Sequence, residues 1–221
     1  LHTAYRRQRQ MCIRDRYKGY MPFLDSLMAE GLTFKYSFSN GMKSIDGMPS
    51  VLSGIPMFIE PFFLTPSSLN TVSSIGGELG KKGYYTAFFH GADNGSMGFE
   101  AFARTAGYTH YFGRTEYNEA NPDNKDFDGH WGIWDEKFFQ FFGNTLSGFQ
   151  QPFAAALFSL SSHHPFAVPA EYEGVFPKGN KPIRQCIGYT DNALKLFFEK
   201  VSKEPWYKNT LFVFTADHTN S

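Results

Sequence analysis

Short apolar runs alternate with amphipathic segments along this chain. Three apolar runs, residues 84–89, 153–160 and 211–216, are bounded by Gly, Pro or polar residues, and residues 32–38 resemble a fourth. Such runs are typical of strands buried on both faces of a parallel sheet. Helices are expected over residues 20–31, 48–54, 69–82, 99–106, 135–142 and 183–203. The alternation predicts an α/β fold with a largely parallel central sheet and helices on both faces.

Loops are expected where Gly, Asn, Asp, Pro and Ser gather, because these residues favour turns. Residues 40–47, 115–129 and 170–180 have this composition. The first of these loops leads directly into the helix expected at residue 48.

A histidine comes shortly after each of three apolar runs: His90, His163 and His218. Asp217 stands beside the last of them. The carboxyl ends of strands in open α/β sheets are where ligands bind. A carboxylate and a neutral imidazole are ligands for Zn²⁺ or Mn²⁺. Asp217 and His218 therefore predict half of a metal site. The alternative for a single histidine after a strand is a structural role.

Composition narrows the class of protein. The chain has 221 residues, 21 basic and 21 acidic residues with no formal net charge, and 25 Phe. This length and apolar content suit one α/β domain with a sizeable core. The neutral balance argues against a nucleic-acid binder, which needs a basic surface. No apolar stretch approaches the roughly 20 residues that span a bilayer.

Residues 1–16 differ from the rest of the chain, because they are rich in arginine and have no apolar periodicity. The string MCIRDR resembles translated sequencing-adapter sequence, so we interpret residues 1–16 as a non-native tail. The alternative is a native basic tail that binds an anionic surface. Without Cys12, only Cys186 remains, and one cysteine cannot form an internal disulfide.

Several motifs together resemble the sulfatase-type branch of the alkaline phosphatase superfamily, and within it the phosphoglycerol transferases similar to lipoteichoic acid synthase. The resemblance covers residues 17–221, which we expect to be a partial sulfatase-like catalytic domain, truncated at both ends. The motifs that carry it are residues 22–27 (PFLDSL), 43–54 (KSIDGMPSVLSG), 89–91 (FHG), 131–135 (WGIWD), 162–166 (SHHPF) and 214–218 (FTADH).

The resemblance implies that Ser44 is a nucleophile that also binds the divalent metal, with Asp217 and His218 as further ligands. A metal or a base is needed to turn a serine hydroxyl into a nucleophile. Lys43 could add positive charge beside the phosphoryl oxygens. Asp46 and Met48 stand where sulfatases carry their formylglycine signal, which favours phosphodiester chemistry over sulfate-ester hydrolysis. The alternative is that Ser44 only caps a helix.

The same resemblance suggests a substrate side of the site. His163 is expected to face the head group and to act as general acid. Trp131 is expected to line a glycerol pocket, with Asp126 or Asp128 binding glycerol hydroxyls. His90 could bind substrate or orient the Ser44 loop. The alternative for Trp131 and His90 is ordinary packing.

The resemblance implies a metal-dependent transferase of phosphoglycerol, or a related phospho-head group, to an acceptor hydroxyl through a covalent Ser44 intermediate. The expected cofactor is Mn²⁺ or Zn²⁺, with Mg²⁺ as a further option. The expected substrates are an anionic phospholipid or other phospho- or sulfo-ester and a glycan or glycerol-phosphate acceptor. The parent protein is expected at the extracytoplasmic face of the bacterial membrane, tethered by N-terminal helices outside this chain.

Three alternatives stay open: a phosphoethanolamine transferase, a hydrolase of sulfuric or phosphoric esters, and an inactive truncated fragment. The family carries an acidic metal ligand on a strand that should precede Tyr17, and the sequence does not show it.

Overall fold

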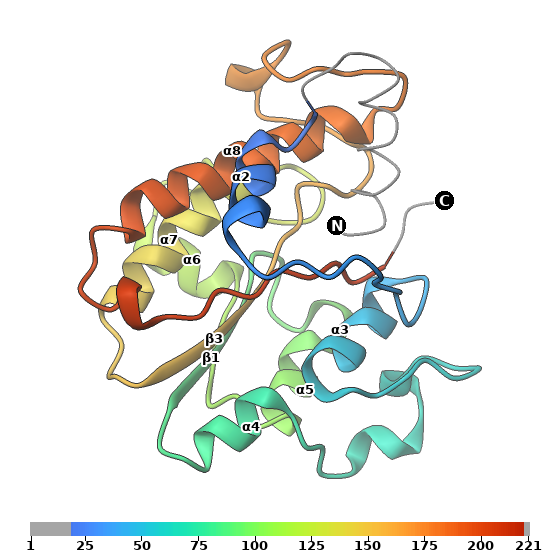
Figure 1. Ribbon diagram of the computed structural model, residues 1–221. Helices are drawn as coiled ribbons and strands as arrows, with labels where there is room; N and C mark the ends of the chain where they lie inside the picture. Colours follow the sequence, from blue (N-terminus) through green and yellow to red (C-terminus); the bar gives the residue numbers. More distant parts are fainter. Residues whose placement is uncertain (1–18, 219–221) are drawn as a thin grey trace.

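A parallel sheet forms the centre of the computed structural model, which describes residues 19–218 (Figure 1). The expected tail at residues 1–16 lies outside the described residues. Within the described part, three strands lie in the order β2-β1-β3: β1 (Tyr85–His90), β2 (His110–Phe112) and β3 (Phe153–Phe158). Both neighbours run parallel to β1, with Phe88 opposite Tyr111 on one side and Ala156 on the other. This arrangement confirms the expected α/β fold.

The central strand β1 is buried on both faces, as its continuous apolar sequence predicts. Phe88 packs into a cluster on one face, whereas Ala87 and Phe89 pack into a cluster on the other. Successive side chains of a strand point to opposite faces, so each face receives alternate residues of β1.

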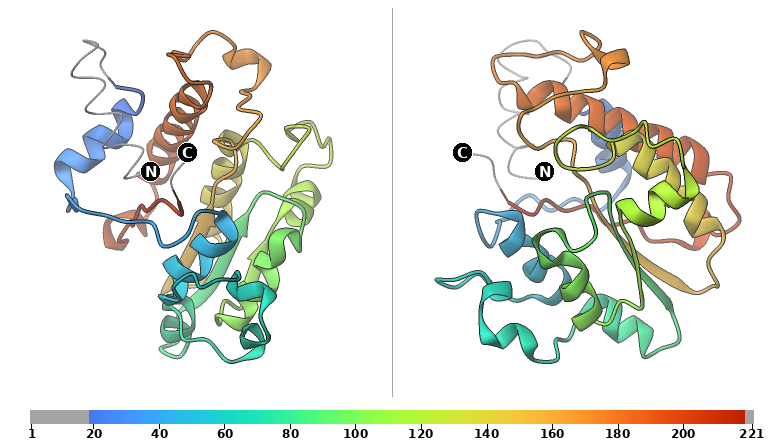
Figure 2. Two further views of the ribbon diagram at one scale, coloured as in Figure 1. Left: turned by 90° about the vertical axis from the view of Figure 1, so that its right-hand side faces the viewer. Right: turned by 180° about the vertical axis from the view of Figure 1, so that it is seen from behind.

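Helices cover both faces of the sheet (Figures 1 and 2). On the face of Phe88 lie α3 (Ser44–Ser53), α4 (Ile75–Gly80) and α5 (Phe99–Thr105). On the other face lie α6 (Arg114–Ala120), α7 (Asp135–Ser147) and α8 (Ile183–Val201), and α2 (Pro22–Glu30) packs on α8. Short 3₁₀ turns are η1 (Phe62–Leu64), η2 (Pro66–Leu69), η3 (Ser96–Gly98), η4 (Ala170–Tyr172) and η5 (Tyr207–Asn209). No helix in the described part of the chain is long and apolar enough to cross a membrane.

Asp191 of α8 holds the N-terminus of α2 in place. Its carboxylate accepts hydrogen bonds from the backbone N–H groups of Phe23 (2.9 Å) and Leu24 (2.8 Å). These are N–H groups of the first helical turn, which have no partner inside the helix. The N-cap residue Met21 supplies no side-chain acceptor, so α8 provides the cap that the local sequence lacks. Burial raises the pKa of the Asp191 carboxyl.

Residues 32–38 and 211–216 are not strands, contrary to expectation. They run side by side across the molecule, outside the sheet (Figures 1 and 2). Leu32, Phe38 and Leu211 are 86%, 89% and 87% exposed. Their apolar sequence is typical of a strand, but a strand also needs a hydrogen-bonded neighbour, which a pattern along one segment cannot report. Phe212 still packs on Phe198, with ring centroids 4.9 Å apart.

Helix boundaries differ from expectation at three places. Helix α3 begins at Ser44 rather than at Met48. Helix α4 is shorter than residues 69–82, because Ser74 caps it by accepting the Gly77 N–H at 2.9 Å. Helix α6 begins at Arg114 and takes up the first part of the loop expected over residues 115–129.

A side-chain cap explains α6. Glu116 accepts the Gly113 N–H at 2.6 Å, which satisfies a donor at the start of the helix. The short strand β2 was not predicted, because three residues carry too little pattern to distinguish a strand from a loop.

Candidate active site

Ser44, Asp217 and His218 lie together although 174 positions separate Ser44 from His218. The Oγ of Ser44 is 3.3 Å from Nε2 of His218, and the same nitrogen is 3.4 Å from Oδ2 of Asp217. The side chains of Asp217 and His218 are 25% and 26% exposed, so a ligand can reach them. The Ser44 hydroxyl and the Asp217 carboxylate therefore both contact the imidazole of His218.

Helix α3 presents Ser44 as its first residue. The preceding Lys43 has an extended backbone, and its carbonyl accepts the N–H groups of Asp46 and Gly47, both at 3.0 Å. Met48 and Leu52, one turn apart, anchor α3 in the core against α5 and β1. The free N–H groups and the dipole at this end of the helix favour a negatively charged group beside Ser44. Lys43 is exposed at the same end of α3.

Gly47 permits the approach of the C-terminal segment to α3. A Cβ atom at Gly47 would lie 2.7 Å from Cβ and 2.9 Å from the backbone oxygen of Asp217. Only a residue without a side chain leaves room for Asp217 there. The sequence signal was a glycine inside a helix, which is unfavourable unless packing requires it. Our sequence analysis did not use that signal.

The three side chains suit a divalent cation as part of its ligand set. Carboxylate and imidazole are common ligands of Zn²⁺, and carboxylate also suits Mn²⁺. The described residues contain no group of three His, Cys, Asp or Glu side chains that could hold a metal. Asp217 and His218, with the Ser44 hydroxyl, thus provide a partial set of donors. Asp46, in the first turn of α3, is buried, and its Oδ1 has no hydrogen-bond partner.

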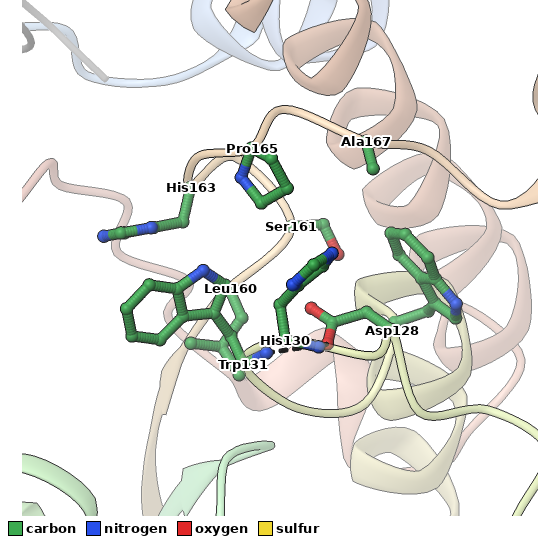
Figure 3. Close-up of a pocket in the computed structure, with 9 residues that line it drawn as sticks. Asp128, His130, Trp131, Leu160, Ser161, His163, Pro165 and Ala167 are labelled. Atoms are coloured by element: carbon green, nitrogen blue, oxygen red, sulfur yellow. Dashed lines mark hydrogen bonds between the residues drawn. The ribbon is translucent and has the colours of Figure 1, made fainter.

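A pocket between two loops holds a second group of predicted residues (Figure 3). One loop precedes α7 and contributes Asp128 and Trp131. The other follows β3 and contributes His163. The indole N–H of Trp131 donates to the His164 carbonyl at 2.6 Å, and the Trp131 and His163 ring centroids are 4.3 Å apart. The structure therefore brings Asp128, Trp131 and His163 together.

Asp135 joins these two loops, and sequence reasoning missed it. Its Oδ1 accepts the Leu160 N–H at 2.8 Å, and its Oδ2 accepts the Thr190 hydroxyl at 3.0 Å. Its own N–H donates to the Ser161 hydroxyl at 2.9 Å. Burial raises the pKa of the Asp135 carboxyl, whereas these hydrogen bonds lower it. No periodic pattern distinguishes a buried aspartate at the start of a helix from an exposed one.

Two predicted residues lie outside both groups. Asp126 accepts the Tyr117 hydroxyl at 2.5 Å and does not line the pocket. His90 is fully buried against Phe99 and Phe158, and burial lowers its pKa to about 4. These positions favour the packing role for His90, whose imidazole stays neutral at neutral pH.

Comparison with known proteins identifies the family. The family model described as Sulfatase matches residues 10–221. The chain belongs to the sulfatase family. This is an enzyme family of the alkaline phosphatase superfamily, as expected from the motifs around Ser44 and Asp217.

Curated relatives are phosphoglycerol transferases. Phosphoglycerol transferase I of Salmonella typhimurium is 26% identical over 226 residues, which cover 92% of this chain and 28% of that protein. Phosphoglycerol transferase I of Citrobacter koseri is 27% identical over 222 residues, with the same coverage. The chain thus spans under a third of the length of these relatives.

Solved structures share the fold. A protein of the alkaline phosphatase superfamily from Vibrio parahaemolyticus has a TM-score of 0.74 and 26% identity, covering 85% of this chain and 46% of that one. The lipoteichoic acid synthase LtaP from Listeria monocytogenes has a TM-score of 0.70 and 23% identity, covering 83% and 46%. The phosphoglycerol transferase GacH of Streptococcus pyogenes, in complex with sn-glycerol-1-phosphate, has a TM-score of 0.56 and 12% identity, covering 85% and 52%.

Proposed function

We propose that the protein transfers a phosphoglycerol or related phospho-head group to an acceptor hydroxyl, with Ser44 as the nucleophile. The observation that carries this proposal is the contact of Ser44 Oγ with His218 Nε2 at the N-terminus of α3. The relatives named phosphoglycerol transferase I support the choice of head group. The proposed donor is an anionic phospholipid, and the proposed acceptor is a glycan or a glycerol phosphate.

Asp217, His218 and Ser44 would hold the divalent cation, which we propose to be Mn²⁺ or Zn²⁺. When bound, such an ion lowers the pKa of a coordinated hydroxyl and offsets the charge of the phosphate. Further ligands would have to come from outside the described residues. Because the proposed donor is a membrane lipid, and in line with the family resemblance, we also propose that the protein works at the extracytoplasmic face of the bacterial membrane.

The chemistry of Ser44 occurs in two displacements. In the first, Oγ loses its proton to solvent and forms a bond to phosphorus, while the bond from phosphorus to the leaving alcohol breaks. His163 is proposed to give its proton to that alcohol oxygen. In the second, the acceptor hydroxyl attacks the phosphoserine, its proton returns to His163, and Ser44 is released. Lys43 and the first N–H groups of α3 are placed to stabilise the negative phosphoryl oxygens.

The test uses the full-length protein, phosphatidylglycerol labelled in its head group, and mass spectrometry of the peptide that contains Ser44. Ser44→Ala should lower turnover by roughly 10³-fold or more and abolish the phosphoserine adduct. Asp217→Asn should weaken metal binding, so excess Mn²⁺ should partly restore its turnover but not that of Ser44→Ala. Ser53→Ala is the matched control, because it lies in the same helix and its hydroxyl has no hydrogen-bond partner. Near-normal activity of Ser44→Ala would show that Ser44 is not the nucleophile and only forms the start of α3.

A further inference from the structure

Asp135 is a buried carboxylate that bonds to distant parts of the chain rather than to its own helix. It is the first residue of α7, where an acidic side chain commonly accepts N–H groups of the first helical turn. Here one carboxylate oxygen accepts a donor from the loop after β3, and the other accepts a donor from α8. Asp135 therefore fixes these two segments relative to the start of α7.

Leu160 connects Asp135 to His163 in two steps. The backbone N–H of Leu160 donates to Oδ1 of Asp135 at 2.8 Å, and the Leu160 carbonyl accepts the backbone N–H of His163 at 3.0 Å. Leu160 and the next residue, Ser161, are buried, so water does not readily replace these bonds. The position of the His163 backbone thus depends on the position of the carboxylate.

A second connection runs through α8. The Thr190 hydroxyl donates to Oδ2 of Asp135 at 3.0 Å, and the Thr190 oxygen is 3.3 Å from the hydroxyl of Ser162. The N–H of Asp135 itself donates to the Ser161 hydroxyl at 2.9 Å. Each of residues 160–162, which directly precede His163, is therefore bonded to Asp135 or to its partner Thr190.

The ring of His163 extends from this anchored loop. Its side chain is exposed, and in Figure 3 it lies beside the indole of Trp131, with ring centroids 4.3 Å apart. Nδ1 of His163 is 3.1 Å from the His164 carbonyl, which leaves Nε2 to face a substrate. A general acid must come within hydrogen-bond distance of the leaving oxygen, and a displacement of about 1 Å can cost about 10²-fold in rate. An exposed general acid therefore needs a firmly held backbone.

A purely structural role for Asp135 is the alternative, and Asp191 shows what such a role involves. Asp191 is also buried, and its carboxylate also accepts two hydrogen bonds, but these join α8 to the start of α2. Loss of either carboxylate should destabilise the protein, because buried N–H groups lose their acceptor. Only the loss of Asp135 should alter the chemistry that His163 performs.

We propose that Asp135 is a positioning residue, which holds residues 160–162 so that His163 reaches the leaving oxygen of the donor. The assignment rests on the proposed transferase function, in which His163 gives its proton to that oxygen. Asp135 takes no part in bond making or proton transfer.

Two donors with different leaving groups test this role in the metal-loaded full-length protein. Phosphatidylglycerol releases diacylglycerol, whose oxygen needs a proton, whereas the p-nitrophenyl diester of glycerol phosphate releases nitrophenolate, which does not. The first displacement is followed by rapid quenching for each donor. Asp135→Ala should slow diacylglycerol release by about 10²-fold but nitrophenolate release by less than about threefold. Asp135→Asn keeps an acceptor for the Leu160 N–H and should recover most of the loss.

A double-mutant cycle tests whether Asp135 acts through His163. Once His163 is replaced by alanine, Asp135→Ala should slow diacylglycerol release by less than about twofold further, because residues that act as a unit are not additive. Asp191→Ala is the matched control, which should lower stability in urea but leave the ratio of the two release rates unchanged. Thr190→Val removes one bond of Asp135 and should shift that ratio less, in the same direction, which keeps the test available if Asp135→Ala does not fold.

The position of His163 can also be observed without turnover, by NMR of protein that carries isotopically labelled histidine. The Trp131 indole should displace the His163 ring signals, and Asp135→Ala should move them towards those of free histidine, whereas Asp191→Ala should not. Equal slowing of both leaving groups, full additivity with His163→Ala, or unchanged His163 signals would overturn the positioning role. If no Ser44 adduct forms in the wild-type protein, the transferase proposal fails, and the His163 signals alone decide whether Asp135 positions this residue.

Discussion

Replacing Gly47 by alanine tests whether the close approach of Asp217 to α3 sets the geometry of the site. The added Cβ would lie 2.7 Å from Cβ, 2.9 Å from the backbone oxygen and 3.0 Å from Cα of Asp217. Two of these three atoms are backbone atoms and the third, Cβ, is bonded directly to the backbone, so rotation of a side chain cannot relieve the overlap. The C-terminal segment must move away from α3, and Ser44 must separate from His218.

The magnitude follows from ordinary carbon–carbon contact distances. Non-bonded carbon atoms rest at about 3.5–4.0 Å, so Asp217 has to move by roughly 1 Å. A displacement of about 1 Å in a catalytic group can cost about 10²-fold in rate. Overpacking costs about 1–3 kcal/mol of stability, but alanine gains about 1 kcal/mol over glycine inside a helix. The expected net loss of stability is therefore small beside the loss of turnover.

The assay compares head-group transfer and urea unfolding for Gly47→Ala and Gly80→Ala in the full-length protein. Gly80 also lies in a helix, and a Cβ there would be 3.7 Å from its nearest neighbour, a methyl group of Thr86. Gly80→Ala should keep full activity and equal or exceed wild-type stability. Gly47→Ala should lose about 10²-fold in turnover and bind metal more weakly.

Wild-type turnover and metal affinity in Gly47→Ala would refute the reasoning. Such a result would mean that Asp217 does not support turnover or metal binding from the position that it has beside α3. A variant that simply fails to fold would be recognised by a lost unfolding transition and would equally contradict the small stability change expected here.

Two further predictions concern buried groups. Asp191→Ala should destabilise the protein by about 1–2 kcal/mol, because it leaves the Phe23 and Leu24 N–H groups without their acceptor. Asp191→Asn keeps one oxygen, so its free energy of unfolding, measured in urea, should lie between those of the wild type and Asp191→Ala. Burial lowers the pKa of His90 from 6.5 to about 4. Between these two pH values the unfolded chain therefore binds a proton at His90, whereas the folded chain does not. The stability present above pH 6.5 should therefore fall by up to about 3 kcal/mol as the pH approaches 4, and His90→Leu should remove that part of the pH dependence of unfolding.

The sequence predicted the sheet where strands are buried on both faces. Residues 84–89 and 153–160 carry continuous apolar runs, and they form β1 and β3. Residues 32–38 and 211–216 carry equally clear patterns and yet form no strand in the structure. Strand formation depends on the neighbour that supplies hydrogen bonds, and a pattern along one segment contains no information about that neighbour.

The sequence predicted some of the candidate site residues and missed others, because it contains no direct information about contacts between distant residues. Asp217 and His218 were predicted because they follow an apolar run, and Ser44 because the motif around it resembles that of the sulfatase family; the structure places the three side chains together. Gly47 and Asp135 were missed because their roles depend on contacts with Asp217 and Leu160, which are distant in sequence. His90 and His163 show the same local pattern, but only the structure shows that one is enclosed and the other exposed.

The contact between Ser44 and His218 also has a thermodynamic consequence. A cation bound by both would act as a staple that closes most of the chain into one loop, and a staple across a long loop removes much of the entropy of the unfolded state. The C-terminal segment otherwise packs through a few aromatic contacts such as Phe212 on Phe198. Occupancy of the cation site and closure of the domain would then be linked equilibria, so the melting temperature would rise with the concentration of free metal.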